Sequence, residues 1–252
     1  MNPRQRLILE QLQGGRELSV GELARQFGVS PITIRRDLDA LAREGPVTRT
    51  HGGAILSRAG VIEFSFRERA QECIEQKQAI ARHMAGVVQP GMTVVLDTGT
   101  TTLEVARAIA GTSRLCVITS SLAIASALQA HDNLDLILLG GNVRQESPDL
   151  TGPLTEDNLR LFRPDLAILG ADAVDRGGAY TSDLRVAAIS RAMIDGAGET
   201  WLVADSSKFA RRALVQFADW TQIDHLVTDA GLGRKERKWA GKAIPDLRVA
   251  EA

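Results

Sequence analysis

The sequence is poor in cysteine and has no metal-binding pattern. Its two cysteines, Cys73 and Cys116, are far apart and form no C-x-x-C pair. Neither a disulfide framework nor a zinc ribbon is therefore indicated. The four histidines also lack the spacing of metal ligands, so no metal site is predicted.

Long apolar runs are absent as well. No stretch approaches the ~18 consecutive apolar residues that a membrane helix requires. The opening residues, MNPRQRLILEQL, lack the apolar core and small-residue cleavage site of a secretion signal. We therefore expect a cytoplasmic protein without a membrane partner. A content of 44% hydrophobic and 24% charged residues is ordinary for a globular protein, and 252 residues suit one or two domains.

Two nucleotide-binding patterns are missing. The sequence has no G-x-x-x-x-G-K-[ST] motif, and no G-x-G-x-x-G follows a predicted strand. Nucleotide cofactors are not indicated, and we predict that the protein uses no cofactor.

The net charge of -1 conceals an asymmetry between two parts of the chain. Residues 1–58 contain nine arginines and six acidic residues and carry +3, whereas the remainder carries -4. Scattered charge usually marks only a solvated surface. A basic N-terminal part is also what a nucleic-acid partner requires, so the positions of the arginines decide between the two interpretations.

The basic part begins with signals for two short helices. Asn2 can cap the first helix, which the glycines at 14–15 end. Ser19 and Glu22 form a capping box for the second helix, and Gly28 closes it after about two turns.

A third helix follows after a tight turn. Ser30 can cap it, Pro31 stands at its first position, and Gly45 ends it. Its apolar stripe consists of Ile34, Leu38 and Leu41. The order is helix, tight turn, helix.

Residues beside that stripe carry the prediction of DNA binding. Thr33, Arg35 and Arg36 lie near the helix N-terminus, where the backbone N–H groups and the helix dipole favour phosphate. Arginine can bind guanine bidentately or grip the backbone, and Thr33 can contact a thymine methyl or a phosphate. These are the positions that a recognition helix uses. The alternative is a solvent-exposed helix start, which the sequence of three capped helices disfavours.

Residues 46–54 predict a short hairpin, because β-branched residues lead to a Gly-Gly turn. A hairpin beside a recognition helix is a wing. Arg49 and His51 are placed to reach a neighbouring backbone or minor groove, although His51 has a solvated turn residue as its alternative. The predicted DNA-binding residues are Ser30, Thr33, Arg35, Arg36, Arg49 and His51.

The pattern changes in the remaining part of the chain. Apolar runs rich in β-branched residues recur between helix-length segments, at 92–99, 115–121, 134–141, 165–172, 200–207 and 225–231. Such runs predict the buried, mostly parallel sheet of an α/β domain.

Polar residues end these predicted strands, where α/β folds bind their ligands. The first run ends in DTGTTT, residues 97–102, and a glycine turn with hydroxyls at a helix N-terminus suits phosphate. A simple helix cap is the alternative. The other ends contribute hydroxyls, open backbone, carboxylates and a lysine, at 119–121, 140–141, Asp172 and 205–208. Together they suit a small polyhydroxylated anion.

The stretch LSVGELARQFGVSPITIRRDLDALAREG, followed by VTRTHGGA, resembles the winged helix-turn-helix of the DeoR family of bacterial transcription regulators. Pro46 departs from the pattern, because proline at the first strand position of the wing removes a ladder donor. DTGTTT and the TSS, LGG and ADSSKF segments are similar to the effector domain of the same family. The resemblance thus covers nearly the whole chain.

The resemblance implies an effector domain with a fold like that of ribose-5-phosphate isomerase, which binds phosphorylated sugars or related metabolites. The positions that it carries over are Asp97, Thr98, Gly99, Thr100, Thr101, Thr102, Ser120, Gly140, Gly141, Asp172 and Lys208. Ser120 departs from the commoner T-N-S of the family, so an amide contact to the ligand is not expected. Asp183 and Arg185 precede a predicted helix at 186–195 and are added as residues that line the sugar end of the ligand.

The same likeness raises an alternative, a sugar-phosphate isomerase-like enzyme fused to a DNA-binding domain. GADAVD, residues 170–175, resembles the DGADEVD stretch of ribose-5-phosphate isomerases, but Leu169 replaces the first aspartate and Ala173 the glutamate. Isomerisation requires a carboxylate base and donors for the enediolate, and no coherent set surrounds Asp172 or Asp183. We therefore predict no catalytic residues and no enzymatic activity.

The sequence predicts a DNA-binding regulator of sugar metabolism genes, most often a repressor in such a family, with double-stranded operator DNA and a phosphorylated sugar as partners. A winged helix-turn-helix domain over 1–57, a linker over 58–75 and an α/β effector domain over 76–252 are expected. One winged helix contacts only a few base pairs, so a homo-oligomer, dimer or tetramer, is predicted. The basic run at 233–239 is either a second nucleic-acid patch or a solvated helix face.

Overall fold

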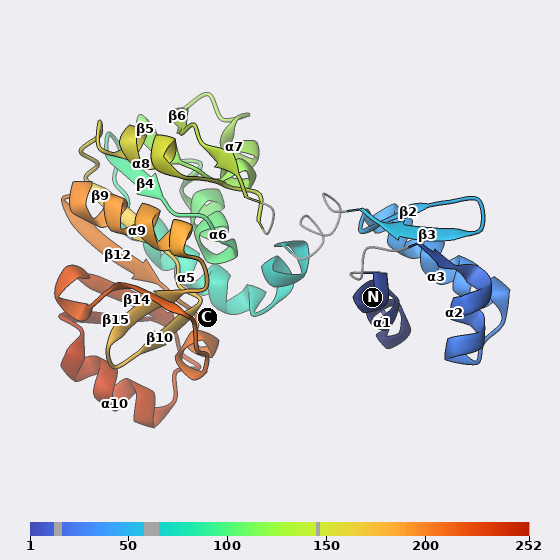
Figure 1. Cartoon of the computed structure of the whole chain (residues 1–252). Helices are drawn as coiled ribbons and strands as arrows, with labels where there is room; N and C mark the ends of the chain where they lie inside the picture. Colours follow the sequence, from blue (N-terminus) through green and yellow to red (C-terminus); the bar gives the residue numbers. More distant parts are fainter. Residues whose placement is uncertain (13–16, 58–65, 145–146, 252) are drawn as a thin grey trace. The chain divides into compact units, whose positions relative to one another are not determined.

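The computed structural model describes residues 1–12, 17–57, 66–144 and 147–251. The chain divides into two compact units, one built on residues 1–69 and one on residues 70–144 and 149–252 (Figure 1). None of the helices in these ranges combines the length and the apolar character that crossing a membrane demands. Part of the predicted linker, residues 58–65, lies outside the described residues.

The first unit contains the predicted helices, which are α1 (Pro3–Leu12), α2 (Val20–Phe27) and α3 (Pro31–Glu44). The predicted caps of α2 and α3 and the Asn2 cap of α1 are confirmed, whereas the glycines at 14–15, predicted to end the first helix, lie outside the described residues. The Asn2 side chain accepts a hydrogen bond from the Gln5 N–H at 2.9 Å. Ser19 forms the capping box, Ser30 caps α3, and glycines in the left-handed region, with φ of +63° and +102°, follow α2 and α3.

The wing is an antiparallel hairpin of β2 (Val47–Arg49) and β3 (Gly53–Leu56). A third strand, β1 (Leu18–Ser19), pairs with β3. We had not predicted it, because two residues are too few for a periodic pattern in the sequence. Pro46 lies just before β2 rather than inside it, and its carbonyl accepts from the Ser57 N–H at 2.9 Å.

A buried carboxylate joins α1 to α3. Asp37 is only 4% exposed, and its Oδ2 lies 2.6 Å from the Arg4 Nε. Its Oδ1 accepts from the side-chain amides of Asn2 and Gln5, each at 3.2 Å. A buried charge is tolerated only when it is paired and hydrogen-bonded, so these contacts fix α1 on the inner side of α3. Apolar residues of all three helices and the wing fill the rest of this core, among them Ile8, Leu23, Ile34, Leu38 and Val47.

The second unit is built on a seven-stranded sheet in the order β15-β14-β12-β9-β4-β5-β6, and every neighbouring pair is parallel. Its strands are β4 (Thr93–Leu96), β5 (Leu115–Thr119), β6 (Leu134–Leu138), β9 (Leu166–Leu169), β12 (Glu199–Val203), β14 (His225–Asp229) and β15 (Asp246–Ala250). All six predicted runs are strands, which confirms the α/β prediction. The additional strand β15 lies at an edge of the sheet and is mostly half-buried, so it has no continuous apolar run.

Helices cover both faces of this sheet, and they are α5 (Ile74–Val87), α6 (Thr100–Ile109), α7 (Leu122–Leu128), α8 (Pro153–Leu159), α9 (Leu184–Gly196) and α10 (Arg234–Ala243). The chain moves outward from β4 to β6, returns to β9, and then moves the other way to β15. With right-handed crossovers, this reversal places α6 and α7 on one face and α9 and α10 on the other (Figure 1).

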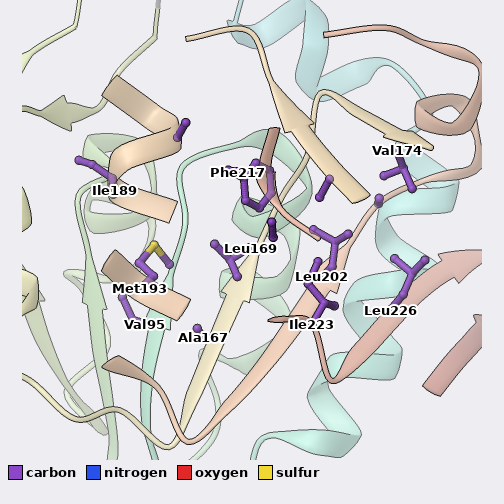
Figure 2. Close-up of a cluster of buried hydrophobic side chains, with 14 of the residues drawn as sticks. Val95, Ala167, Leu169, Val174, Ile189, Met193, Leu202, Phe217, Ile223 and Leu226 are labelled. Carbon is purple, nitrogen blue, oxygen red and sulfur yellow. The ribbon is translucent and has the colours of Figure 1, made fainter. Parts of the chain in front are cut away.

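The larger core lies between the sheet and α9. Figure 2 shows Ile189 and Met193 of α9 beside strand residues of the sheet. The strand residues that meet there include Val95, Ala167, Leu169, Leu202 and Leu226. Because alternate strand residues point to opposite faces and both faces are covered, the strands are apolar almost throughout.

Short antiparallel elements complete the second unit and were not predicted. They are β10 (Ala173–Asp175), β11 (Gly178–Thr181) and β13 (Val215–Ala218) in one sheet, and the pair β7 (Asn142–Val143) and β8 (Leu150–Thr151). Two short 3-10 helices, η1 (Ser206–Ala210) and η2 (Trp220–Gln222), are also present. Elements of this length carry too few residues for a periodic pattern.

Replacement of Asp37 by alanine should destabilise the first unit by about 2–4 kcal/mol, because it leaves a partly buried arginine and two amides without their acceptor. Asp39→Ala is the matched control: this carboxylate is 59% exposed and, among the described residues, pairs only with Arg49, so its loss should cost less than about 1 kcal/mol. Urea unfolding of the full chain measures both values. Equal losses in the two variants would contradict a structural role for Asp37.

Candidate functional site

The outer face of α3 carries two unpaired arginines. Arg35 and Arg36 are exposed and form no hydrogen bond or ion pair with any described residue. Thr33 is half-buried, and its hydroxyl lies 2.9 Å from the Ser30 Oγ, which also accepts from the Thr33 N–H. Ser30 and Thr33 therefore hold the helix start, while the two guanidinium groups are available to a polyanion.

The wing is attached to α3 through Arg49. The Arg49 Nε lies 3.2 Å from the Asp39 Oδ1 of α3. We predicted that Arg49 reaches a neighbouring DNA backbone or minor groove, and this stays a prediction; in the structure its side chain pairs with α3. His51 is exposed in the turn between β2 and β3.

The order of strands reverses at β4, which has β5 on one side and β9 on the other. Open α/β sheets bind ligands in the crevice outside such a point. There the Asp97 Oδ2 accepts from the Gly170 N–H at 3.1 Å and its Oδ1 from the Thr98 N–H at 2.7 Å. Asp97 thus links the segments that follow β4 and β9.

The Asp97 carboxyl has an unusual pKa. It is 4% exposed, and burial raises its pKa to about 7, with Asp149 and Asp172 adding like-charge repulsion. The two backbone hydrogen bonds oppose this increase only in part. A carboxyl whose pKa is shifted to near neutral pH by burial is typical of functional sites.

The N-terminus of α6, at Thr100, follows Asp97 after Thr98 and Gly99 and has no side-chain cap. The backbone N–H groups of residues 100–102 donate to no described acceptor. The hydroxyls of Thr98, Thr100 and Thr101 also form no hydrogen bond with the described residues. Gly99 has extended backbone, and a Cβ there would meet nothing closer than the Thr102 Oγ1 at 3.4 Å. This segment therefore presents open donors that suit an anion.

Gly140 and Gly141 have a different role from the one that we predicted. We expected open backbone at Gly140, but its N–H donates to the Asn158 Oδ1 at 3.1 Å and its carbonyl accepts from the Thr155 Oγ1 at 2.8 Å. Gly141 has a φ of +154°, and a Cβ there would lie 2.1 Å from the Thr155 Oγ1. These glycines allow the chain to pack closely against α8.

A chain of ion pairs includes Asp149, which also acts electrostatically on Asp97. Arg144 binds Asp149 through two hydrogen bonds of 2.6 and 2.7 Å, and its Nη1 lies 3.6 Å from the Asp183 Oδ2. Asp183 in turn pairs with Arg185 at 2.6 Å and caps α9. The Arg185 hydrogen bond is the main reason that the pKa of Asp183 is lowered to about 2. Asp172 accepts from the Ser182 N–H at 2.8 Å, next to this chain.

Two lysines form a second cluster at the end of β12. Lys77 of α5 is 2% exposed, and burial lowers its pKa, an effect that Lys208 reinforces and the buried Asp205 opposes. No described contact joins this cluster to Asp97, although β12 and β4 are separated only by β9 and end at the same edge. Ser120 is buried at the end of β5, where its carbonyl accepts from the Leu150 N–H at 2.9 Å.

Sequence reasoning missed three residues of these clusters, which are Lys77, Arg144 and Asp149. Lys77 left a signal, because it continues the stripe of Ile80, Ala81 and Met84 at helical spacing, and a lysine on an apolar stripe is unusual. Arg144 and Asp149 left none, since their bidentate pairing depends on the β7–β8 hairpin. Within the described ranges no group of three or more His, Cys, Asp or Glu residues suits a metal ion.

Comparison with known proteins identifies both units. Residues 4–59 match the DeoR-like helix-turn-helix domain, and residues 72–230 match the DeoR C terminal sensor domain. The chain belongs to the DeoR family. As a DeoR-family regulator, it has a winged helix-turn-helix and an α/β sensor domain, as its sequence predicts.

Its relatives are named as transcription regulators. The glycerol-3-phosphate regulon repressor of Escherichia coli is 35% identical over 88% of each chain. The regulator GlpR of Haloferax volcanii is 35% identical over 96% of each chain, and the repressor AccR of Agrobacterium fabrum is 36% identical over 90% of this chain and 89% of its own.

Among solved structures, a D-ribose-5-phosphate isomerase in complex with phospho-erythronic acid is similar, with a TM-score of 0.41 and 18% identity over 54% of this chain and 53% of that chain. The translation initiation factor eIF-2B of Pyrococcus horikoshii gives a TM-score of 0.46 and 17% identity over 90% and 95%. Both likenesses concern the fold alone.

Asp97 should make the stability of the protein depend on pH. Its folded pKa is raised, so the folded state binds more protons than the unfolded state, and stability present in acid is lost as the pH rises from about 4 to about 7. Asp97→Asn should remove this loss of stability at higher pH. Asp132→Asn, which changes an exposed aspartate, is the control and should show the same loss as the wild type. Denaturant unfolding at about pH 5 and about pH 8 measures the difference. If the free energy of unfolding of Asp97→Asn depended on pH as strongly as that of the wild type, Asp97 would not be the group responsible.

Proposed function

We propose that this regulator represses genes of sugar metabolism and that a phosphorylated sugar, bound where β4 and β9 end, controls its affinity for operator DNA. The observation that carries the proposal is the uncapped N-terminus of α6 at the reversal of strand order. An anion there accepts hydrogen bonds from backbone groups that have no described acceptor, in the direction that the helix dipole favours.

The remaining polar groups suit the rest of a sugar phosphate. The free threonine hydroxyls at 98, 100 and 101 donate to phosphate oxygens without adding charge. Asp97 and Asp172 offer acceptors to sugar hydroxyls, and the Asp183–Arg185 pair lies at the start of α9 beside them. Lys77 and Lys208 add positive charge at the same edge of the sheet. The name of the Escherichia coli relative, a glycerol-3-phosphate regulon repressor, agrees with a small phosphorylated polyol.

Regulation then follows from linkage. A ligand that binds the DNA-incompetent arrangement more tightly lowers operator affinity, and DNA lowers ligand affinity by the same factor. Specific binding requires several recognition helices on repeated half-sites, so we propose a homo-oligomer acting in the cytoplasm, where the DNA is.

One observation favours a second candidate, an isomerase. Asp97, with a pKa of about 7, has the acidity of a general base. We nevertheless infer that the protein is not an enzyme, because the relatives are named as regulators and Leu169 and Ala173 replace acidic residues of the isomerase pattern. Interconversion of pentose phosphates by the purified protein would reverse this conclusion.

The ligand site can be tested by a thermal-shift screen against phosphorylated sugars, their free sugars and inorganic phosphate. A ligand at ~100 times its Kd should stabilise the wild type by about 2.7 kcal/mol. Thr100→Asp should lose this response through like-charge repulsion, whereas the neutral Thr100→Asn should retain it. An aspartate at a helix N-terminus preserves the helix, so Thr100→Asp remains folded. A full response in Thr100→Asp would exclude the α6 N-terminus as the phosphate site.

The DNA surface can be tested with Arg36→Ala, measured by fluorescence anisotropy on duplex DNA selected by the wild type from a random library. If Arg36 binds a base, its loss should weaken binding by about 1–3 kcal/mol. Arg237→Ala in α10 removes the same charge from the other basic run and should change affinity little. Equal weakening by both variants would mean that general charge, not α3, drives binding.

A further inference from the structure

An exposed isoleucine stands at the start of α3. Ile32 is 60% exposed, more than the other large apolar residues described in the first unit, of which Leu7 is 47%, Met1 43% and Ile55 40% exposed. A single exposed apolar residue is ordinary on a protein surface. The residues that share its face of α3 indicate a role for this one.

Ile32 shares a face of α3 with Arg35, Arg36 and Asp39, at spacings of three, four and seven residues. The buried residues Asp37 and Leu38 lie on other sides of the helix. The two arginines are unpaired within the described residues, and Arg49 neutralises Asp39. This face therefore presents two free cations, one compensated carboxylate and an apolar tip.

The apolar tip lies at the part of a recognition helix that contacts base edges. N-terminal residues of that helix enter the major groove, where the C5-methyl of thymine is the apolar group that a protein can read. Thr33 is less suited to this contact, because its hydroxyl is held at 2.9 Å by Ser30 and the residue is half-buried. Ile32 is β-branched and therefore stiff, so it loses little side-chain freedom on contact.

We propose that Ile32 determines part of the operator specificity by packing against a thymine methyl, next to the bases or phosphates that Arg35 and Arg36 bind. The proposal rests on the proposed function, in which α3 enters the major groove. It adds a requirement for thymine over cytosine or uracil at one position of each half-site.

The methyl contact has a direct chemical test, because uracil pairs like thymine and lacks only the methyl group. Duplex DNA is first selected from a random library by the full-length wild type. Each thymine of the selected site is then replaced by uracil in turn. Removal of one buried methyl should weaken wild-type binding about fourfold, which corresponds to ~0.8 kcal/mol. One replacement per half-site should show this loss.

A double-mutant cycle then assigns the loss to Ile32. Ile32→Ala should bind the thymine site more weakly than the wild type and should show no further loss with uracil. Leu7→Ala, an exposed apolar residue of α1, is the matched control and should keep the fourfold uracil effect. Arg36→Ala should bind more weakly overall and also keep it. Ile32 is exposed, so its replacement should leave the thermal stability nearly unchanged.

Four outcomes would overturn the inference about Ile32. The uracil effect could persist in Ile32→Ala, it could disappear only in Ile55→Ala of the wing, or Ile32→Ala could dissociate an oligomer in sedimentation, which would place Ile32 in a protein interface. If wild-type binding is specific but no uracil replacement weakens it, the inference about Ile32 fails and DNA binding stands. If the wild type selects no sequence at all, the proposed function itself fails.

Discussion

Right-handed crossovers in a parallel sheet are the constraint on which the second unit depends. Because the chain leaves β4 in one direction and later leaves β9 in the other, helices must cover both faces. The strands are then buried on both sides, which explains their apolar sequences. Polar groups that follow the strands are brought to one edge of the sheet, and folds of this kind bind ligands where the two directions diverge.

Asp97 is a buried carboxyl group beside the proposed ligand site, and its burial raises its pKa. Burial raises the pKa of this carboxyl most, and the negative charges of Asp149 and Asp172 raise it further. Two backbone N–H groups hold it in place at the junction of β4 and β9. A phosphate bound at the neighbouring α6 N-terminus would add a further negative charge and favour the protonated form of Asp97. Ligand binding and proton uptake would then be coupled in the same site.

Two aspartates of α3 connect this helix to different parts of the first unit. Asp37 is buried and binds side chains of α1, whereas Asp39 is exposed and binds Arg49 of the wing. The helix is thereby fixed from both sides, and its remaining face presents Ile32, Arg35 and Arg36 outward. The cationic character of this surface comes from helical geometry, since the whole chain has a net charge of only -1.

The sequence by itself determined the starts of the three helices of the first unit, the ends of α2 and α3, the six apolar strands, and the threonine-rich segment after β4. Caps, helical stripes and apolar runs are local, so they can be seen without knowledge of the fold. Only the tertiary structure decided the order of the strands, the pairing of Arg144 with Asp149, the burial of Lys77 and the closed backbone of Gly140. Each of these features depends either on contacts between residues that are distant in sequence or on burial. Neither can be read from the order of residue types along the chain.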